Sequence, residues 1–159
     1  MPDNRPPHVV LPCEGELIDA GGDRYRFLAT REVTDGKYGI WEAVVPPGGG
    51  PPPHLHTREE EGFYVIDGEI AVDADSRRVV AGAGAFVNMP VGSTHWFRNE
   101  VDRPARMLVI VAPGGMEGLF RQTGRAVADR ASPIPPLGDE EKRRIAAAAP
   151  AFGIEVKVH

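Results

Sequence analysis

The sequence predicts an all-β fold, a sandwich or barrel of short antiparallel strands. Segments rich in β-branched and aromatic residues recur at a spacing of roughly 8–12 residues, with turn-forming residues between them. The chain holds 19 glycines and 16 prolines in 159 residues, as expected for many short strands joined by turns. Its hydrophobic content of 42% argues against disorder, and helical periodicity begins only after residue 113.

The N-terminal third is predicted to begin with an arm followed by two strands. Residues 1–14 form this arm, because four prolines there disfavour both helix and central strand. Residues 23–28 alternate polar and apolar side chains, the pattern of a half-buried strand. The sequence Thr34-Asp35-Gly36 indicates a turn, and residues 37–45 form the next strand.

The middle of the chain is predicted to contain hairpins and a buried strand. Asp67-Gly68 is a favoured type I′ pair and is expected to join two neighbouring strands. A second turn is expected at Asp75-Ser76. The strands expected in this region are residues 63–66, 69–73, 77–81, 85–89, 95–100 and 106–112.

The last part of the chain is predicted to be helical. Residues 116–123 carry apolar side chains on one helical face, and Asp139 is expected to cap a helix over residues 140–149. We therefore expect a barrel domain over residues 15–113 and a helical C-terminal extension, residues 114–159, packed on it. The apolar face of the first helix leads to the hypothesis that it covers the mouth of the barrel.

Three residues could form part of a metal site. His54 and His56 are two apart, so an extended backbone turns both imidazoles to the same face. Glu61 follows five residues later. Imidazole and carboxylate donors together suit a divalent transition metal, whereas the alternative interpretation is a solvated loop of histidine and glutamate.

These stretches resemble the paired motifs of the cupin superfamily. The first motif, G-x5-H-x-H-x4-E-x6-G, is matched by Gly48, His54, His56, Glu61 and Gly68. The second motif, G-x5-P-x-G-x2-H-x3-N, is matched by Gly84, Pro90, Gly92, His95 and Asn99. The resemblance implies a jelly-roll β-barrel and one divalent transition metal held by His54, His56, Glu61 and His95. Iron, manganese, nickel or cobalt would suit the ligands, and zinc would also fit.

The amino-acid sequence around the first motif is similar to that of bacterial quercetin 2,3-dioxygenase-like cupins. That similarity implies a dioxygenase cleaving an enolised aromatic, flavonol-like substrate with O₂, in which Glu61 is both ligand and catalytic base. Two alternatives stay open: a redox-silent isomerase, cyclase, lyase or decarboxylase, and a small-molecule binding protein. Four apolar residues are expected to line the substrate pocket and favour an aromatic or hydrophobic substrate: Phe63, Val65, Phe97 and Phe120.

Charge and composition narrow the classes of partner. The net charge is −5 and no basic run occurs, so we expect no nucleic-acid partner. No stretch of about 18 apolar residues is present, so we expect no membrane span. The single cysteine, Cys13, and the absence of an apolar leader lead us to expect a reducing, cytoplasmic location. An N-terminal arm and an exposed sheet edge lead us to expect a homodimer.

Overall fold

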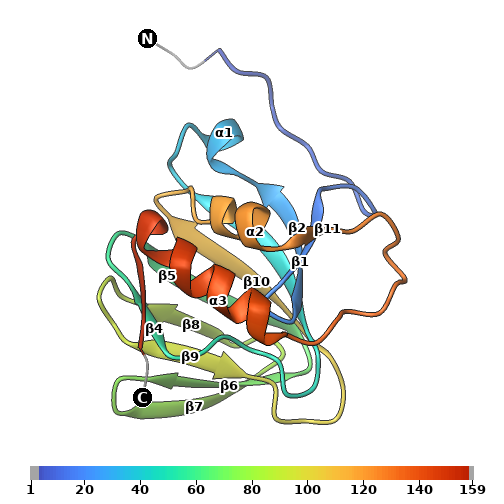
Figure 1. Cartoon of the computed structure of the whole chain (residues 1–159). Coiled ribbons are helices and arrows are strands. Elements are labelled where there is room, and N and C mark those ends of the chain that lie inside the picture. Colours follow the sequence, from blue (N-terminus) through green and yellow to red (C-terminus); the bar gives the residue numbers. More distant parts are fainter. Residues whose placement is uncertain (1–3, 158–159) are drawn as a thin grey trace.

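Two antiparallel sheets form the body of the protein, as seen in a computed structural model that describes residues 4–157 (Figure 1). The larger sheet contains β1 (Leu17–Ala20), β2 (Asp23–Ala29), β3 (Gly39–Val45), β5 (Glu60–Asp67), β8 (Phe86–Met89), β10 (Ala105–Ala112) and β11 (Arg125–Ala126). The smaller sheet contains β4 (His54–His56), β6 (Glu69–Ala74), β7 (Arg77–Gly82), β9 (His95–Arg98) and β12 (Ile154–Val156). The strand orders are β11-β1-β2-β3-β10-β5-β8 and β12-β4-β9-β6-β7, and the predicted all-β jelly-roll fold is confirmed.

The core lies between the two sheets because strand alternation turns one set of side chains inward. In β3, every second residue from Gly39 to Val45 is buried, and Trp41 is fully inaccessible. The neighbouring strand β10 repeats this pattern with Met107, Val109 and Val111. Ile70 and Val72 of the smaller sheet belong to the same core cluster. Period-two alternation in the sequence therefore produces the buried interior directly.

The prediction of a hairpin at Asp67-Gly68 is wrong. The strand before this pair, β5, is bonded to β10 and β8, whereas the strand after it, β6, is bonded to β7 and β9. Gly68 has φ +82°, but Asp67 has no positive φ, and a type I′ turn requires both. A Cβ on Gly68 would lie 2.9 Å from Cα of Ala105, so the chain passes closely over β10 as it leaves one sheet for the other. The second predicted turn, at Asp75-Ser76, does join the paired strands β6 and β7.

Short helices lie on one side of the barrel (Figure 1). The predicted turn at Thr34-Asp35-Gly36 follows a short helix, α1 (Arg31–Thr34), whose C-cap residue Asp35 has φ +55°. The predicted helix over residues 116–123 is confirmed as α2 (Glu117–Thr123). It packs against α3 (Asp139–Ala148), which continues into a 3₁₀ turn, η1 (Ala149–Phe152). Gly138 rather than Asp139 occupies the N-cap of α3, so Asp139 is the first helical residue and not its cap.

The C-terminal region also adds strands to both sheets. β11 pairs with β1, and β12 pairs with β4, the strand that carries His54 and His56. Residues 114–157 therefore contribute to the barrel wall as well as to its helical cover. None of the described helices has the length and apolar character needed to cross a membrane.

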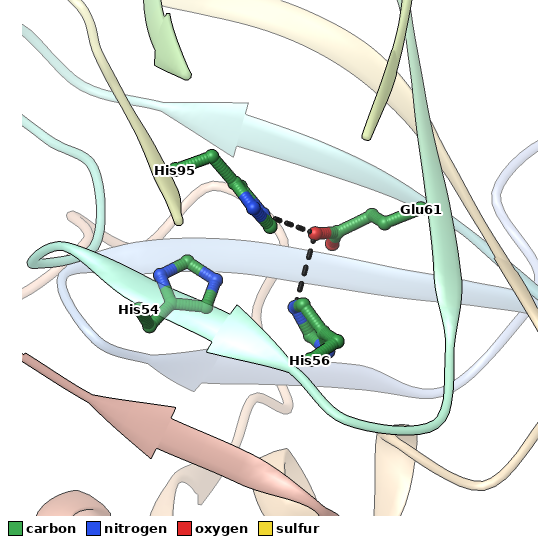
Figure 2. A group of neighbouring side chains, drawn as sticks. All are labelled: His54, His56, Glu61 and His95. Atoms are coloured by element: carbon green, nitrogen blue, oxygen red, sulfur yellow. Dashed lines mark hydrogen bonds and ion pairs between the residues drawn. The ribbon is translucent and has the colours of Figure 1, made fainter. Parts of the chain in front are cut away.

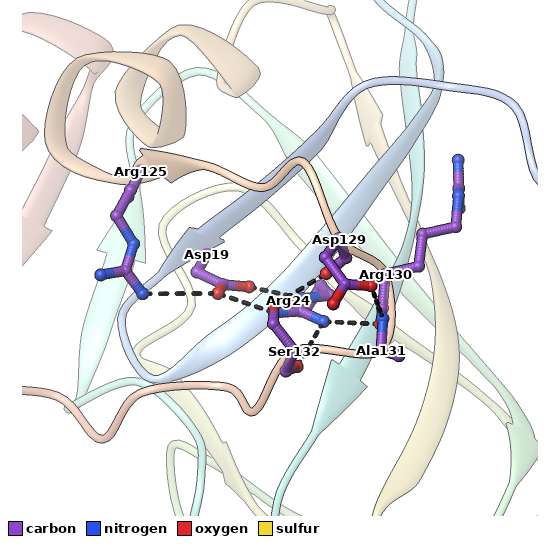
Figure 3. Close-up of polar contacts among 7 residues, drawn as sticks. All are labelled: Asp19, Arg24, Arg125, Asp129, Arg130, Ala131 and Ser132. Atoms are coloured by element: carbon purple, nitrogen blue, oxygen red, sulfur yellow. Dashed lines mark hydrogen bonds and ion pairs between the residues drawn. The ribbon is translucent and has the colours of Figure 1, made fainter.

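A buried ion pair fixes the segment between β11 and α3 (Figure 3). Nε and Nη2 of Arg24 donate to the two carboxylate oxygens of Asp19, at 2.7 and 2.9 Å. Nη1 of Arg24 donates to the backbone carbonyls of Arg130 and Ser132, both at 2.9 Å. Because neighbours along a strand point to opposite faces, Arg24 faces this segment while Asp23 and Tyr25 face the interior. β2 therefore holds the covering segment on one face and lines the barrel on the other.

Candidate metal centre

The two histidines of the first motif point into the barrel from one short strand. His54 and His56 are both buried, and Leu55 between them is only half-buried. His54 lies directly opposite His95 in the β4–β9 pair, so strand pairing brings the second motif to the first. One donor atom from each of His54, His56, Glu61 and His95 can be chosen so that all four lie within 4.8 Å of one another (Figure 2).

Glu61 reaches the three histidines from the opposite sheet. Its Oε2 lies 2.9 Å from Nε2 of His95 and 3.1 Å from Nε2 of His56. Glu61 is itself almost fully buried on β5. Three imidazoles from the smaller sheet and one carboxylate from the larger sheet thus converge across the barrel interior (Figure 2).

Backbone carbonyls orient two of the imidazole rings. Nδ1 of His54 lies 2.9 Å from the carbonyl oxygen of Pro52, and Nδ1 of His95 lies 3.0 Å from that of Ser93. A carbonyl can only accept a hydrogen bond, so in each case Nδ1 carries the proton and donates it. Nε2 is then the nitrogen that faces the centre, and a neutral ring would offer its lone pair there to a metal ion.

The pKa values of the clustered residues are shifted in different directions. Burial would raise the pKa of Glu61, but His56 and His95 outweigh it and hold that pKa well below its usual range. Burial would lower the pKa of His56, but the carboxylates of Glu59 and Glu61 raise it to about 9. Burial lowers the pKa of His54 to about 4, with Glu61 opposing the change. The neighbouring carboxylates therefore favour the protonated form of His56. A metal ion bound between these groups would supply the positive charge in place of that proton.

The arrangement suits a single divalent transition metal. Neither ring nitrogen of the buried His56 has a well-formed hydrogen bond, although carboxylate oxygens lie within 3.5 Å of both. Three imidazole nitrogens and one carboxylate oxygen leave two positions of an octahedron for other ligands. The donor set does not select among the first-row metals, so the identity of the metal stays open.

An apolar cavity of about 90 Å³ adjoins the cluster. His54 and Glu61 line it, together with Trp41, Phe97 and Phe120. The remaining lining residues come from several elements: Ala20, Gly21, Asp23, Tyr25, Pro51, Pro52, Val109, Met116, Leu119, Thr123, Leu137, Ile145, Ala149, Ile154 and Val156. Nearly all of this surface is carbon, so the metal site opens into a largely dry space.

The four residues expected in the substrate pocket are divided between cavity and wall. Phe97 and Phe120 belong to the cavity lining, whereas Phe63 and Val65 do not. Phe63 shares a strand face with Glu61, but it packs edge-on against Phe97, with ring centroids 5.4 Å apart, and near His95 at 6.2 Å. These two rings take up the space beside Phe63, so Phe63 belongs to the buried barrel wall. Only Phe97 and Phe120 stay in the substrate pocket that we propose.

Helix α2 covers one side of the cavity. Met116 before it and Leu119 and Phe120 within it line the cavity. The ring of Phe120 stacks on Tyr25 with centroids 4.1 Å apart and meets Trp41 edge-on at 5.5 Å. The apolar helix face found in the sequence is thus turned toward the cavity that contains Glu61.

Three further residues beside the site were not identified from the sequence. Glu59 is buried, and its Oε2 lies 3.4 Å from Nδ1 of His56. Asp23 and Tyr25 of β2 line the cavity, with the Tyr25 hydroxyl 3.4 Å from Oδ2 of Asp23. A signal for Asp23 was present in the sequence, because strict alternation places it on the same face as Tyr25 and Phe27. An aspartate on the apolar face of a strand is unusual and marks a candidate functional group.

Comparison with known proteins agrees with this geometry. The family profile described as "Cupin domain" matches residues 41–111, which include all four clustered residues. A polyketide synthase protein, CurC of Streptomyces cyaneus, is 31% identical over 128 residues, covering 77% of this chain and 82% of that protein. The chain belongs to the cupin family.

Other cupins similar to this one differ in length or share mainly the fold. Quercetin 2,3-dioxygenase of Bacillus subtilis is 27% identical over 124 residues, which cover 78% of this cupin but 36% of the relative. The chain therefore spans about a third of that curated relative. The structure of the polyketide cyclase RemF from Streptomyces resistomycificus superimposes with a TM-score of 0.58 at 23% identity, covering 65% of this cupin and 78% of RemF. That likeness concerns the fold alone.

Proposed function

We propose that this cupin is a metal-dependent enzyme that acts on an enolisable aromatic small molecule, and that its reaction is dioxygenation. One observation carries the proposal: the four-residue donor cluster forms part of the wall of an apolar cavity lined by aromatic rings. A flat hydrophobic substrate with an enol oxygen matches both parts of this site. A sugar phosphate does not match it, because no lysine or arginine is found among the described residues that line the cavity.

The residues of the cluster have separate roles in metal binding and in proton transfer. When bound, a divalent metal supplies Lewis acidity and, if it is redox-active, a place for dioxygen. His54, His56 and His95 would hold it from one sheet. Glu61 is the only carboxylate in the cluster, and it takes the enol proton on a carboxylate oxygen as general base.

The apolar lining would position the substrate and keep water away. Phe97, Trp41 and Phe120 offer ring faces and edges against which an aromatic substrate can pack. A dry site strengthens the electrostatic interactions of the enolate that Glu61 produces. The similarity to quercetin 2,3-dioxygenase of Bacillus subtilis supports the same substrate chemistry.

A redox-silent reaction on a related substrate is the second candidate. The observation that favours it is coverage: the alignment with CurC extends over 82% of that protein, whereas the alignment with the Bacillus dioxygenase extends over 36% of the relative. A polyketide intermediate also carries enolisable carbonyls, so Glu61 could remove a proton from carbon or oxygen without any use of O₂. Cyclisation or isomerisation would then follow.

Oxygen uptake separates the two reactions. Protein loaded separately with Fe(II), Mn(II), Co(II) and Ni(II) is offered flavonols and related enolic phenols in an oxygen electrode. Uptake with one metal that is lost in Glu61→Ala supports dioxygenation. Substrate conversion without uptake, under argon, supports the redox-silent enzyme. Binding without conversion in either condition contradicts both and identifies a binding protein.

We also propose that the protein is a homodimer. β7 and β8 end their respective sheets, and both carry exposed apolar side chains, with Val80 55% and Phe86 57% exposed. Unpaired, apolar edge strands favour pairing with a second copy. Light scattering at micromolar concentration should give a molecular mass twice that of the chain. The double variant Val80→Glu with Phe86→Glu should have the mass of a single chain. A monomeric wild-type protein would contradict the proposal.

A further inference from the structure

A buried carboxyl group lies on the wall of the cavity without a role in the metal cluster. Asp23 is 1% exposed, and β2, on which it lies, carries none of the four clustered residues. Among the residues that the structure describes, its Oδ1 has no hydrogen-bond partner. A buried polar atom left without a partner is costly, and such atoms are retained mainly where another molecule satisfies them.

The surroundings of Asp23 position the group but do not neutralise it. The Tyr25 hydroxyl reaches Oδ2 at 3.4 Å, a long contact, and no arginine or lysine pairs with the carboxyl group. Arg24, the adjacent residue, points to the other face of β2 and is fully engaged by Asp19 and the segment beyond β11. Burial raises the pKa of Asp23 to about 8, so the group is a neutral acid at pH 7. A neutral carboxyl both donates and accepts a hydrogen bond.

Asp23 and Glu61 occupy separate places on the wall of the same cavity. Their strands, β2 and β5, belong to one sheet and are separated by β3 and β10. At about 4.8 Å between neighbouring strands, the two backbones are roughly 14 Å apart along the sheet. The aromatic stack of Tyr25 and Phe120 lies beside Asp23, and Trp41 of β3 lies on the strand between. The cavity thus has two polar places, connected by apolar and aromatic surface.

We propose that Asp23 is a second polar subsite of this cavity, which hydrogen-bonds a phenolic hydroxyl or carbonyl oxygen on a substrate ring distant from the enol. This inference rests on the proposed function and narrows its substrate class to polyphenols or aromatic polyketides with oxygen at both ends. Tyr25 is a positioning residue, whose hydroxyl contacts Oδ2 of Asp23.

Ligands that differ by one remote hydroxyl test this subsite. The probes are three flavonols with two, one or no hydroxyls on the pendant ring: quercetin, kaempferol and galangin. Binding to Ni(II)-loaded protein is measured under argon by quenching of tryptophan fluorescence, in wild type, Asp23→Leu and Asp23→Asn. Thr123→Val is the matched control, because Thr123 also lines the cavity but its hydroxyl already donates to the carbonyl of Leu119 at 2.8 Å.

The expected result is selectivity that depends on Asp23. Asp23→Leu should weaken binding of the hydroxylated flavonols about tenfold and leave galangin within about twofold, since one neutral hydrogen bond is lost. Asp23→Asn can still donate and accept a hydrogen bond, so it should lose less affinity for the hydroxylated flavonols than Asp23→Leu. Thr123→Val should not change the ratio of affinities between the flavonols. Thermal unfolding of each variant verifies that it is folded.

Two outcomes would overturn the inference in different ways. If wild type binds the flavonols but Asp23→Leu weakens all three equally or none of them, the subsite is absent and the proposed function stands. If metal-loaded wild type binds no flavonol, the flavonol-like substrate proposed for the enzyme and the subsite inferred from it both fail.

Discussion

Oε2 of Glu59 lies 3.4 Å from Nδ1 of His56, the ring nitrogen that does not face Glu61. The carboxyl group is buried and comes two residues before Glu61 in the same acidic run. An outer carboxylate that accepts from Nδ1 fixes the ring and makes Nε2 a better donor to a metal. Glu59 is the group placed to do this for His56, although at 3.4 Å the two atoms form no well-formed hydrogen bond of the kind that the backbone carbonyls make with His54 and His95.

Replacement of Glu59 should weaken metal binding without removing a ligand. Glu59→Gln is expected to lower the affinity about 10–100-fold, the usual effect of losing such a partner. Competition with a chromogenic chelator measures it. Glu60→Gln is the control, since Glu60 is exposed and accepts a hydrogen bond from Asn88 at 2.7 Å instead. Equal affinities of the two variants would show that Glu59 does not support His56.

Removal of two ligands should abolish stoichiometric metal. His54→Ala combined with His95→Ala leaves one imidazole and one carboxylate, too few donors for a stable site. After mild chelation and reloading, elemental analysis should find about one metal per chain in wild type and well below a tenth in the variant. His8→Ala provides the control, because His8 is exposed and contacts only the carbonyl of Leu28. Unchanged metal content in the double variant would refute the assignment.

The buried carboxyl of Asp23 should make stability fall as pH rises. Its pKa is raised from 3.8 to about 8, so between these values the unfolded chain has lost a proton that the folded protein retains. Stability from this group is thus greatest below about pH 4, declines up to about pH 8 and is then constant. Asp23→Asn removes the effect and should gain more than about 1 kcal/mol relative to wild type between pH 5 and 8.

Urea unfolding at several pH values measures this difference. The comparison is made between wild type and Asp23→Asn without metal, and repeated with Ni(II) bound. A constant difference between the two proteins across this pH range would show that Asp23 titrates at an ordinary pKa. That outcome would leave the cavity lining unchanged but would remove the neutral acid from it.

Truncation of Phe120 should open the cavity. Phe120→Ala removes the ring that stacks on Tyr25 at 4.1 Å and meets Trp41 at 5.5 Å. We expect a loss of about 1–3 kcal/mol in stability and weaker quercetin binding by about tenfold, because aromatic packing is lost on the cavity side of α2. Tyr38→Ala is the control, since Tyr38 is an exposed aromatic residue that does not line this cavity. Unchanged affinity in a folded Phe120→Ala protein would contradict a lid role for α2.

Local sequence determined the strands and the face on which the donors lie. The spacing of His54 and His56 turns both rings to one side of β4, and alternation around Trp41 and Val109 produces the buried faces of β3 and β10. These properties depend only on the period of the backbone, so they can be predicted from neighbours along the chain. The set His54, His56, Glu61 and His95 was selected by the match to the paired cupin motifs.

Tertiary structure decided which strands are neighbours and what surrounds the donors. Asp67-Gly68 has the local chemistry of a hairpin, but burial of apolar surface places β5 and β6 in different sheets. Asp23 reaches the cavity of Glu61 only because β2, β3, β10 and β5 are adjacent in one sheet. Sheet order is set by contacts between residues distant in sequence, and no local pattern encodes them. The sequence therefore determined the candidate metal ligands, whereas the position of Asp23 on the same cavity became visible only in the folded chain.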